Sequence, residues 1–135
     1  MKPNILIITA NFYEDISSDL SAGAIAEVKA KSKFKKIIVP GVFEIPVIIA
    51  KNIKKYHGFI ALGCVIKGET PHFDFISTTT INAIMNLSIV HKKPIGNGIL
   101  TCLYKRQAKA RSGSFNKVGK GTEAAKAVLS VLNNS

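Results

Sequence analysis

The sequence predicts a three-layer α/β fold, in which helices cover both faces of a doubly wound, four-stranded parallel sheet. Short apolar runs rich in β-branched residues alternate with segments whose apolar residues recur at helical spacing, and this order repeats along the chain. Parallel strands connected by helices build such a sheet. The chain has 135 residues and no internal repeat, so we expect one domain over residues 1–135.

Each expected element has its own composition or boundary signal. The strands are predicted over residues 4–9, 37–39, 59–65 and 95–101, and the first and third are continuous apolar runs typical of buried strands. The helices are predicted over about residues 17–31, 45–56, 74–91, 104–111 and 122–132.

The boundaries rest on capping residues and on proline. Ser17 or Ser18 can cap the first helix. Pro40 ends the second strand, and Pro46 suits the first turn of the second helix, where its missing N–H costs nothing. Pro94 ends the third helix.

The composition indicates a cytoplasmic domain. Cys64 and Cys102 are too few for a disulfide scaffold, which favours a reducing compartment. The apolar run near the N-terminus is too short for a signal peptide. Residues 75–90 are uncharged, but their hydroxyl and amide side chains exclude a membrane span.

The formal net charge of +11 favours anionic ligands or partners. A basic cluster without acids comprises Lys105, Arg106, Lys109, Arg111, Lys117 and Lys120. It is either a local anion site or a solvated face, and charge alone does not separate the two. No nucleic-acid-binding motif accompanies the charge, so nucleic acid is not an expected partner.

Ligands of open α/β sheets bind at the carboxyl ends of the strands, so the loops there are candidate sites. Phe12 and Tyr13 follow the first strand and can stack on a planar ring, although one of them could instead cap the core. Phe43 and Glu44 stand at a helix N-terminus. The Glu44 carboxylate there either complements the helix dipole or accepts hydrogen bonds from a ligand.

The loop of residues 63–75 is the richest in chemical groups. His72 is a candidate proton donor and acceptor that Asp74 could orient, and the alternative is a capping or packing role. His57 and His91 end helices away from the ligand edge and are expected to be structural.

Two rival chemistries in this loop are disfavoured. A nucleophilic set of Cys64, His72 and Asp74 is opposed by the apolar strand around Cys64, which raises a thiol pKa. His72, Asp74 and Glu69 lack the spacing of metal sites, and no glycine-rich nucleotide motif is present. We therefore expect no metal and no cofactor.

Taken together, the loop segments resemble the lumazine synthase family of riboflavin biosynthesis. The matching segments are Asn11-Phe12, residues 39–46 (VPGVFEIP), residues 63–74 (GCVIKGETPHFD), residues 98–101 (GILT), Arg111 and residues 119–125 (GKGTEAA). They follow the family's order and cover nearly the whole chain. The resemblance implies a flavodoxin-like fold and a single lumazine synthase domain over residues 1–135.

The resemblance implies a condensation reaction. 5-Amino-6-(D-ribitylamino)uracil reacts with 3,4-dihydroxy-2-butanone 4-phosphate through a Schiff base, phosphate elimination and ring closure, giving 6,7-dimethyl-8-ribityllumazine, phosphate and water. The alternative is a non-catalytic lumazine- or flavin-binding, or shell-forming, relative of the same fold. The presence of both His72 and Arg111 favours the enzyme.

The resemblance also implies a role for each matching residue. His72 would transfer protons, Phe12 would stack on the pyrimidine ring, and Arg111 would bind the phosphate group. The pyrimidine and its ribityl chain would contact Val42, Phe43, Glu44, Cys64, Val65 and Ile66. The butanone phosphate would contact Glu69 and Thr70. Asn97 stands where the family has a bulky side chain that closes the ring pocket from a neighbouring subunit.

The family's assembly is a pentamer, and in some members twelve pentamers form a hollow shell of sixty subunits. The active site lies between subunits. Here the loop before Lys120 is one residue longer than is common, and the first strand begins almost at once. We therefore expect a homopentamer rather than a shell, with a functional link to riboflavin synthase.

Overall fold

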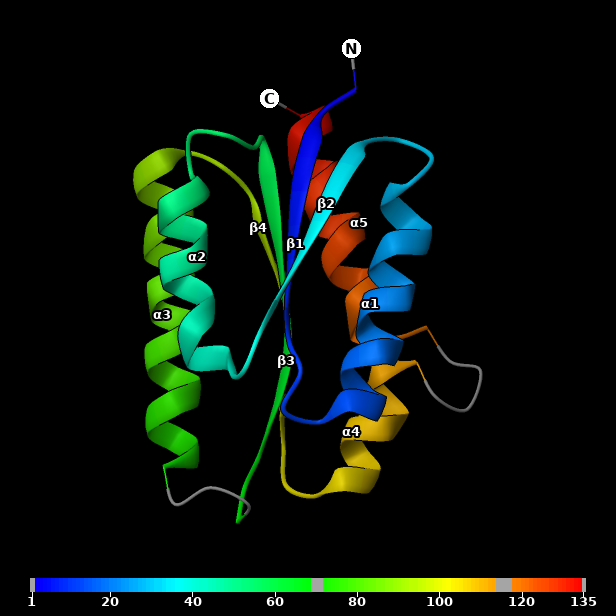
Figure 1. The fold of residues 1–135 in the computed structure, drawn as a ribbon, viewed down its shortest axis with the longest axis vertical. Helices are drawn as coiled ribbons and strands as arrows, with labels where there is room; N and C mark the ends of the chain where they lie inside the picture. The colour runs from blue at the N-terminus through cyan, green and yellow to red at the C-terminus, as the bar shows by residue number, and fades with distance from the viewer. Residues whose placement is uncertain (1, 69–71, 114–117, 135) are drawn as a thin grey trace.

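The computed structural model describes residues 2–68, 72–113 and 118–134, and it confirms the predicted fold class (Figure 1). Four parallel strands form a sheet in the order β2-β1-β3-β4. They are β1 (Asn4–Ala10), β2 (Lys33–Val39), β3 (Gly58–Ile66) and β4 (Ile95–Cys102). The helices are α1 (Glu14–Val28), α2 (Ile45–Asn52), α3 (Phe73–His91), α4 (Lys105–Ser112) and α5 (Lys120–Asn133), and a 3₁₀ turn, η1 (Val42–Glu44), precedes α2.

The layers place a ligand crevice at one edge of the sheet. Helices α2 and α3 cover one face, α1 and α5 cover the other, and α4 lies near the N-terminal end of α1 (Figure 1). From β1 the chain goes to β2 on one side and then to β3 and β4 on the other. The carboxyl ends of β1 and β3 therefore flank the switch point where open α/β sheets bind ligands.

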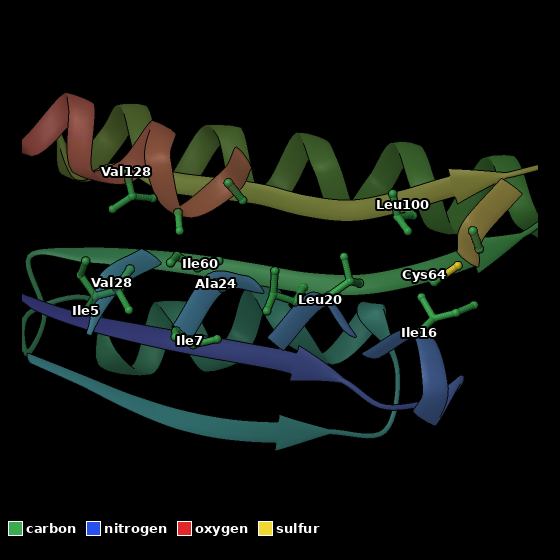
Figure 2. Packing of buried hydrophobic residues seen from close by; sticks show 14 of the residues in the cluster. Ile5, Ile7, Ile16, Leu20, Ala24, Val28, Ile60, Cys64, Leu100 and Val128 are labelled. Carbon is green, nitrogen blue, oxygen red and sulfur yellow. The ribbon is translucent and has the colours of Figure 1, made fainter. Parts of the chain in front are cut away.

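Two apolar clusters fill the space between the layers. Ile5 and Ile7 of β1 belong to the cluster under α1 and α5, together with Ile60 of β3 (Figure 2). Leu6 and Ile8 belong to the cluster under α2 and α3. Because side chains alternate along a strand, a continuous apolar run serves both clusters at once.

The first helix begins earlier than the serines predicted. Tyr13 occupies the N-cap position of α1, and Ser17 lies inside the helix, where its buried hydroxyl donates a hydrogen bond to the Ala10 carbonyl at 2.6 Å. Neither Ser17 nor Ser18 is the cap. Glu14 and Asp15 in the first turn favour the observed start because negative charge is favourable at a helix N-terminus. The helix ends at Val28, short of the predicted residue 31.

Two further boundaries differ from the prediction. β2 begins at Lys33 rather than at residue 37. The prediction missed its first half because this part of the edge strand is exposed and carries no apolar pattern. α2 ends at Asn52, short of Tyr56. Lys93 supports the segment after α2, since its Nζ donates to the carbonyls of Ile53 at 2.6 Å and of Tyr56 at 2.8 Å.

The start of α5 is fixed by a close contact with α1. A Cβ on Gly121 would overlap backbone atoms of Leu20, the carbonyl oxygen included. A glycine is therefore required here by the approach of two helices. Lys120, the first residue of α5, directly precedes this glycine.

Within the described part of the chain, no helix has the length and apolar character needed to cross a membrane.

Candidate functional site

A pocket of about 230 Å³ lies at the carboxyl ends of β1 and β3, and we call it the carboxyl-edge pocket. Its walls come from the loop after β1, from η1, from the end of β3 and from α3. They comprise Phe12, Tyr13, Gly41, Val42, Phe43, Glu44, Cys64, Val65 and Ile76. Six of the predicted substrate contacts are therefore brought together here.

The aromatic wall of this pocket is formed by Phe12 and Tyr13. Their ring centroids lie 4.9 Å apart at an interplanar angle of 80°, an edge-to-face contact. Tyr13 is half-buried against the core, whereas Phe12 is 64% exposed. Of the two roles considered for this pair, Tyr13 therefore packs on the core, and Phe12 keeps an exposed ring face on which a planar ring can stack.

The opposite wall is held by η1. Val42 packs so closely on β3 that a Cβ on Gly63 would lie 2.6 Å from its Cγ1. Glu44 N donates to the Gly41 carbonyl at 3.2 Å, which closes the turn. As a result Phe43 points outward, 61% exposed, and the Glu44 carboxylate is half-buried at the start of α2.

The thiol of Cys64 is unsuited to nucleophilic chemistry. Burial, reinforced by the neighbouring Cys102 thiol, raises the pKa of Cys64 to about 12. The sulfur therefore carries its proton at neutral pH and contributes an apolar surface to the pocket. Its neighbour Val65 also lines the pocket, but Ile66 is buried in the core under α1 and is not part of the pocket wall.

His72 occupies the N-cap position of α3, where its carbonyl accepts a hydrogen bond at 2.8 Å from the N–H of Ile76, a residue of the pocket wall. The His72 side chain is exposed and makes no capping hydrogen bond within the described residues, so the capping alternative is not observed. Nor does Asp74 orient the ring, since no hydrogen bond joins the two side chains where the structure describes them. Glu69 and Thr70 lie outside the described residues.

A second hollow, of about 480 Å³, lies on the outer side of β4, and we call it the β4 hollow. It is lined by Ile81, Asn97, Ile99, Leu100, Thr101, Ala110, Arg111, Val118, Lys120 and Glu123. Asn97 is held in place because its Oδ1 accepts a hydrogen bond from Ile99 N at 3.0 Å. The two hollows share no lining residue, so a single chain does not unite all the predicted contacts.

Lys120 is a candidate site residue to which the sequence assigned no role. It stands in the first turn of α5 and lines the same hollow as Arg111, so two cations converge on one concave surface. The sequence signal for Lys120 was its place in the basic cluster of residues 105–120. The sequence could not show which members of that cluster line the same hollow. Lys105 and Lys109 instead pair with Asp15.

The other two histidines lie away from both hollows. Asn4 N donates to His57 Nδ1 at 2.9 Å, and His57 N donates to the Asn4 carbonyl at 2.8 Å, so His57 supports the start of the sheet. His91 is in the last turn of α3. Among the residues described, no three histidine, cysteine or carboxylate side chains come together as a metal-binding group.

Comparison with known proteins adds a family to this geometry. The family model described as 6,7-dimethyl-8-ribityllumazine synthase matches residues 2–135. A protein of that name from Bartonella tribocorum is 42% identical over 136 residues, covering 96% of this chain and 90% of its own. The 6,7-dimethyl-8-ribityllumazine synthase 1 of Rhodopseudomonas palustris is 43% identical over 94% of this chain and 84% of its own. The 6,7-dimethyl-8-ribityllumazine synthase of Agrobacterium fabrum is 42% identical over 97% of this chain and 93% of its own.

Proposed function

This chain belongs to the 6,7-dimethyl-8-ribityllumazine synthase family, and from that premise we propose how its residues carry out the reaction. The protein is a transferase-type enzyme of riboflavin biosynthesis. It condenses 5-amino-6-(D-ribitylamino)uracil with 3,4-dihydroxy-2-butanone 4-phosphate to 6,7-dimethyl-8-ribityllumazine, with release of phosphate and water. The match over residues 2–135 carries this conclusion.

The carboxyl-edge pocket receives the pyrimidine. Phe12 stacks on its ring with the exposed face that Tyr13 leaves free. Phe43 and Glu44 contact the ring and the ribityl chain, the carboxylate accepting hydrogen bonds from N–H and O–H groups. Cys64 and Val65 close the floor of the pocket. Ile66 supports this floor from the core.

The β4 hollow receives the phosphate of the second substrate. The Arg111 guanidinium is a rigid fork that matches phosphate oxygens, and Lys120 adds a second positive charge in the same hollow. Glu69 and Thr70 contact the four-carbon chain. Asn97, at the rim of the hollow, offers its amide nitrogen to the ring pocket of a neighbouring subunit.

His72 moves the protons. The amine of the pyrimidine attacks the ketone, and loss of water from the adduct gives the Schiff base. Removal of a proton from the carbon chain then expels phosphate and leaves an enol, which becomes a ketone. Attack of the ribitylamino nitrogen on this carbonyl, with loss of a second water, closes the ring. An exposed imidazole one helical turn before Ile76 of the pocket wall can accept and return these protons. Much of the rate comes from holding two substrates side by side.

The complete site is shared by two copies of the chain. One copy supplies the carboxyl-edge pocket with His72, and its neighbour supplies the β4 hollow with Arg111. Apolar side chains on α3, Phe75, Met85, Ile89 and Val90 among them, are more than half exposed and provide surface for such contacts. A head-to-tail contact of this kind closes into a ring.

The ring is a homopentamer, with the sixty-subunit shell as the alternative assembly. The enzyme works in the cytoplasm. Its product is the substrate of riboflavin synthase, which gives the two enzymes a functional link.

A direct assay tests the function. Purified protein mixed with both substrates should form the lumazine, followed by its absorbance, and release inorganic phosphate. Omission of either substrate is the control. Tight binding of the lumazine without turnover would instead support the non-catalytic alternative.

A further inference from the structure

Helix α4, which carries Arg111, lacks the features that usually hold a short helix in place. It has eight residues, of which Ala108 and Ser112 alone are buried. Its first turn carries Lys105 and Arg106, whose positive charge is unfavourable at a helix N-terminus. A helix this short is not stable by itself. Contacts with the rest of the domain must therefore fix its position.

Two carboxylates of α1, the helix that lies beside α4 (Figure 1), supply such contacts. Asp15 Oδ2 lies 3.4 Å from Lys105 Nζ and 3.2 Å from Lys109 Nζ. One turn further along α1, Asp19 Oδ2 accepts a hydrogen bond from Ser112 Oγ at 3.3 Å. The two acids are spaced i, i+4, and their three partners follow i, i+4, i+7, so one stripe of α1 faces one stripe of α4.

The charge state of Asp15 suits this role. Burial by itself would raise the pKa of Asp15, but hydrogen bonds with Lys109 and with Ile16 N, together with the charge of Lys105, lower it below its usual value. The carboxylate is therefore ionised at neutral pH and faces two ammonium groups.

Arg111 projects from a different side of the same helix. Its Nη1 lies 3.9 Å from Cys102 Sγ at the end of β4, and the side chain lines the β4 hollow. Lys109 and Ser112, which α1 holds, are two residues before it and one residue after it. Movement of α4 relative to α1 would move the guanidinium with it.

We propose that Asp15, assisted by Asp19, is a positioning residue for Arg111. By holding α4 against α1, it sets where the guanidinium lies in the β4 hollow. This inference rests on the proposed function, in which Arg111 binds the phosphate of the butanone phosphate.

Two effects of Asp15 on that substrate have opposite signs. Through space, a carboxylate repels a phosphate, so removal of its charge would tighten binding. Through α4, removal of the charge releases Lys105 and Lys109 and loosens the hold of Arg111 on the phosphate. The sign of the change in KM therefore distinguishes positioning from a direct electrostatic effect.

The test compares variants of the assembled enzyme. Asp15→Asn should raise KM for the butanone phosphate about two- to tenfold, the size of one or two exposed ion pairs. KM for the pyrimidine should change less than about twofold. Asp15→Glu keeps the charge and should stay near the parent. Glu14→Gln is the matched control. Glu14 is the neighbour of Asp15 and makes no ion pair within the described residues, so loss of its charge should not raise KM for the butanone phosphate.

A double-mutant cycle separates the possible failures. In an Arg111→Ala background, Asp15→Asn should not raise this KM further, because the group it positions is gone. An unchanged or lower KM in Asp15→Asn, while Arg111→Ala is impaired, overturns the positioning role alone. Equal rises for both substrates, with altered circular dichroism, also overturn it. An Arg111→Ala variant with normal use of the butanone phosphate overturns the phosphate assignment itself.

Discussion

Arg111 donates a hydrogen bond from Nη1 to the sulfur of Cys102, 3.9 Å away, and so lies directly beside the carboxyl end of β4. A thiol sulfur is a weak acceptor and occupies one of the five guanidinium donors. Among residues 2–68, 72–113 and 118–134 the other guanidinium donors find no hydrogen-bond acceptor, and they lie in a hollow that also contains Lys120.

Arg111→Ala should raise KM for the butanone phosphate by about ten- to a hundredfold, because a charge-assisted hydrogen bond is lost. KM for the pyrimidine should change much less. Arg111→Lys keeps the charge without the planar fork, so its KM for the butanone phosphate should lie between those of the parent and of Arg111→Ala. Steady-state kinetics with each substrate varied in turn measures this, and equal effects on both substrates would contradict the assignment.

His72→Ala should lower kcat by about ten- to a hundredfold, at or below the low end for general acid–base catalysis, and should leave the fold intact because the side chain is exposed. Asp74→Asn is the matched control. It should change kcat less than about threefold, since Asp74 makes no hydrogen bond to the imidazole within the described residues. Unchanged turnover in His72→Ala would remove this residue from the mechanism.

The purified protein should sediment as a ring with the mass of about five chains. A mass near sixty chains would replace the ring with the shell, and a stable monomer would remove the shared site altogether.

Mixing tests the shared site directly. His72→Ala and Arg111→Ala subunits, unfolded together and reassembled at equal amounts, should regain about a quarter of the parent activity, because one interface in four combines an intact His72 with an intact Arg111. If both residues came from one chain, mixing would restore nothing.

The stability of the protein should fall as pH rises above about 9. The pKa of Cys64 is raised in the folded state, so the unfolded chain loses this proton first and gains relative stability between about pH 9 and 12. Below about pH 9 the Cys64 thiol keeps its proton in both states, so the stability of the folded state is not reduced by this group. Urea midpoints at about pH 8 and 10.5 measure the fall, and Cys64→Ala should make it shallower. An unchanged slope in this variant would mean that another group is responsible.

Gly121→Ala should destabilise the fold by about 1–3 kcal/mol, because its Cβ would overlap the backbone of Leu20 and push α5 away from α1. Lys126→Ala, on the exposed side of the same helix, is the control and should change stability by less than about 0.5 kcal/mol. Urea unfolding measures both variants. Equal stability would show that the two helices can separate at low cost.

The layered fold was predictable because β3 is buried along its whole length, and only an apolar run can occupy such a strand. β2 was partly missed for the opposite reason. It is an edge strand with exposed lysines, and nothing in its composition marks where it begins. The start of α1 was misplaced because serine is a common N-cap residue. Ser17 instead lies within the helix, where its hydroxyl donates a hydrogen bond to the Ala10 carbonyl.

Six of the residues that line the carboxyl-edge pocket were predicted from the sequence, whereas the arrangement of the two hollows was not. Phe12, Phe43 and Cys64 do converge, since the carboxyl ends of neighbouring parallel strands meet at one edge. Arg111 follows the edge strand β4 and lies in a separate hollow, a separation that depends on strand order and side-chain packing. Ile66 shows the same limit, because it shares a strand face with Cys64 of the pocket wall and is nevertheless packed in the core under α1.

The parallel sheet also determines where the lysines of this basic chain stand. The covering helices run opposite to the strands, so α1, α2 and α3 all end at the amino edge of the sheet (Figure 1). Lys29 and Lys92 directly follow α1 and α3, and Lys51 lies in the last turn of α2. Cations at these positions face the negative ends of the helix dipoles.

The carboxylates show the reverse preference. Glu14, Asp15, Asp74 and Glu123 occupy first turns, where the helix ends are positive. In these helices the named charges match the polarity of the helix ends, whereas Lys105 and Arg106 at the start of α4 do not. Part of the chain's net charge of +11 lies beside the carbonyl ends of these helices, on the edge opposite the carboxyl-edge pocket. The positions of Lys29, Lys51 and Lys92 are thus explained by helix direction, without an anionic ligand.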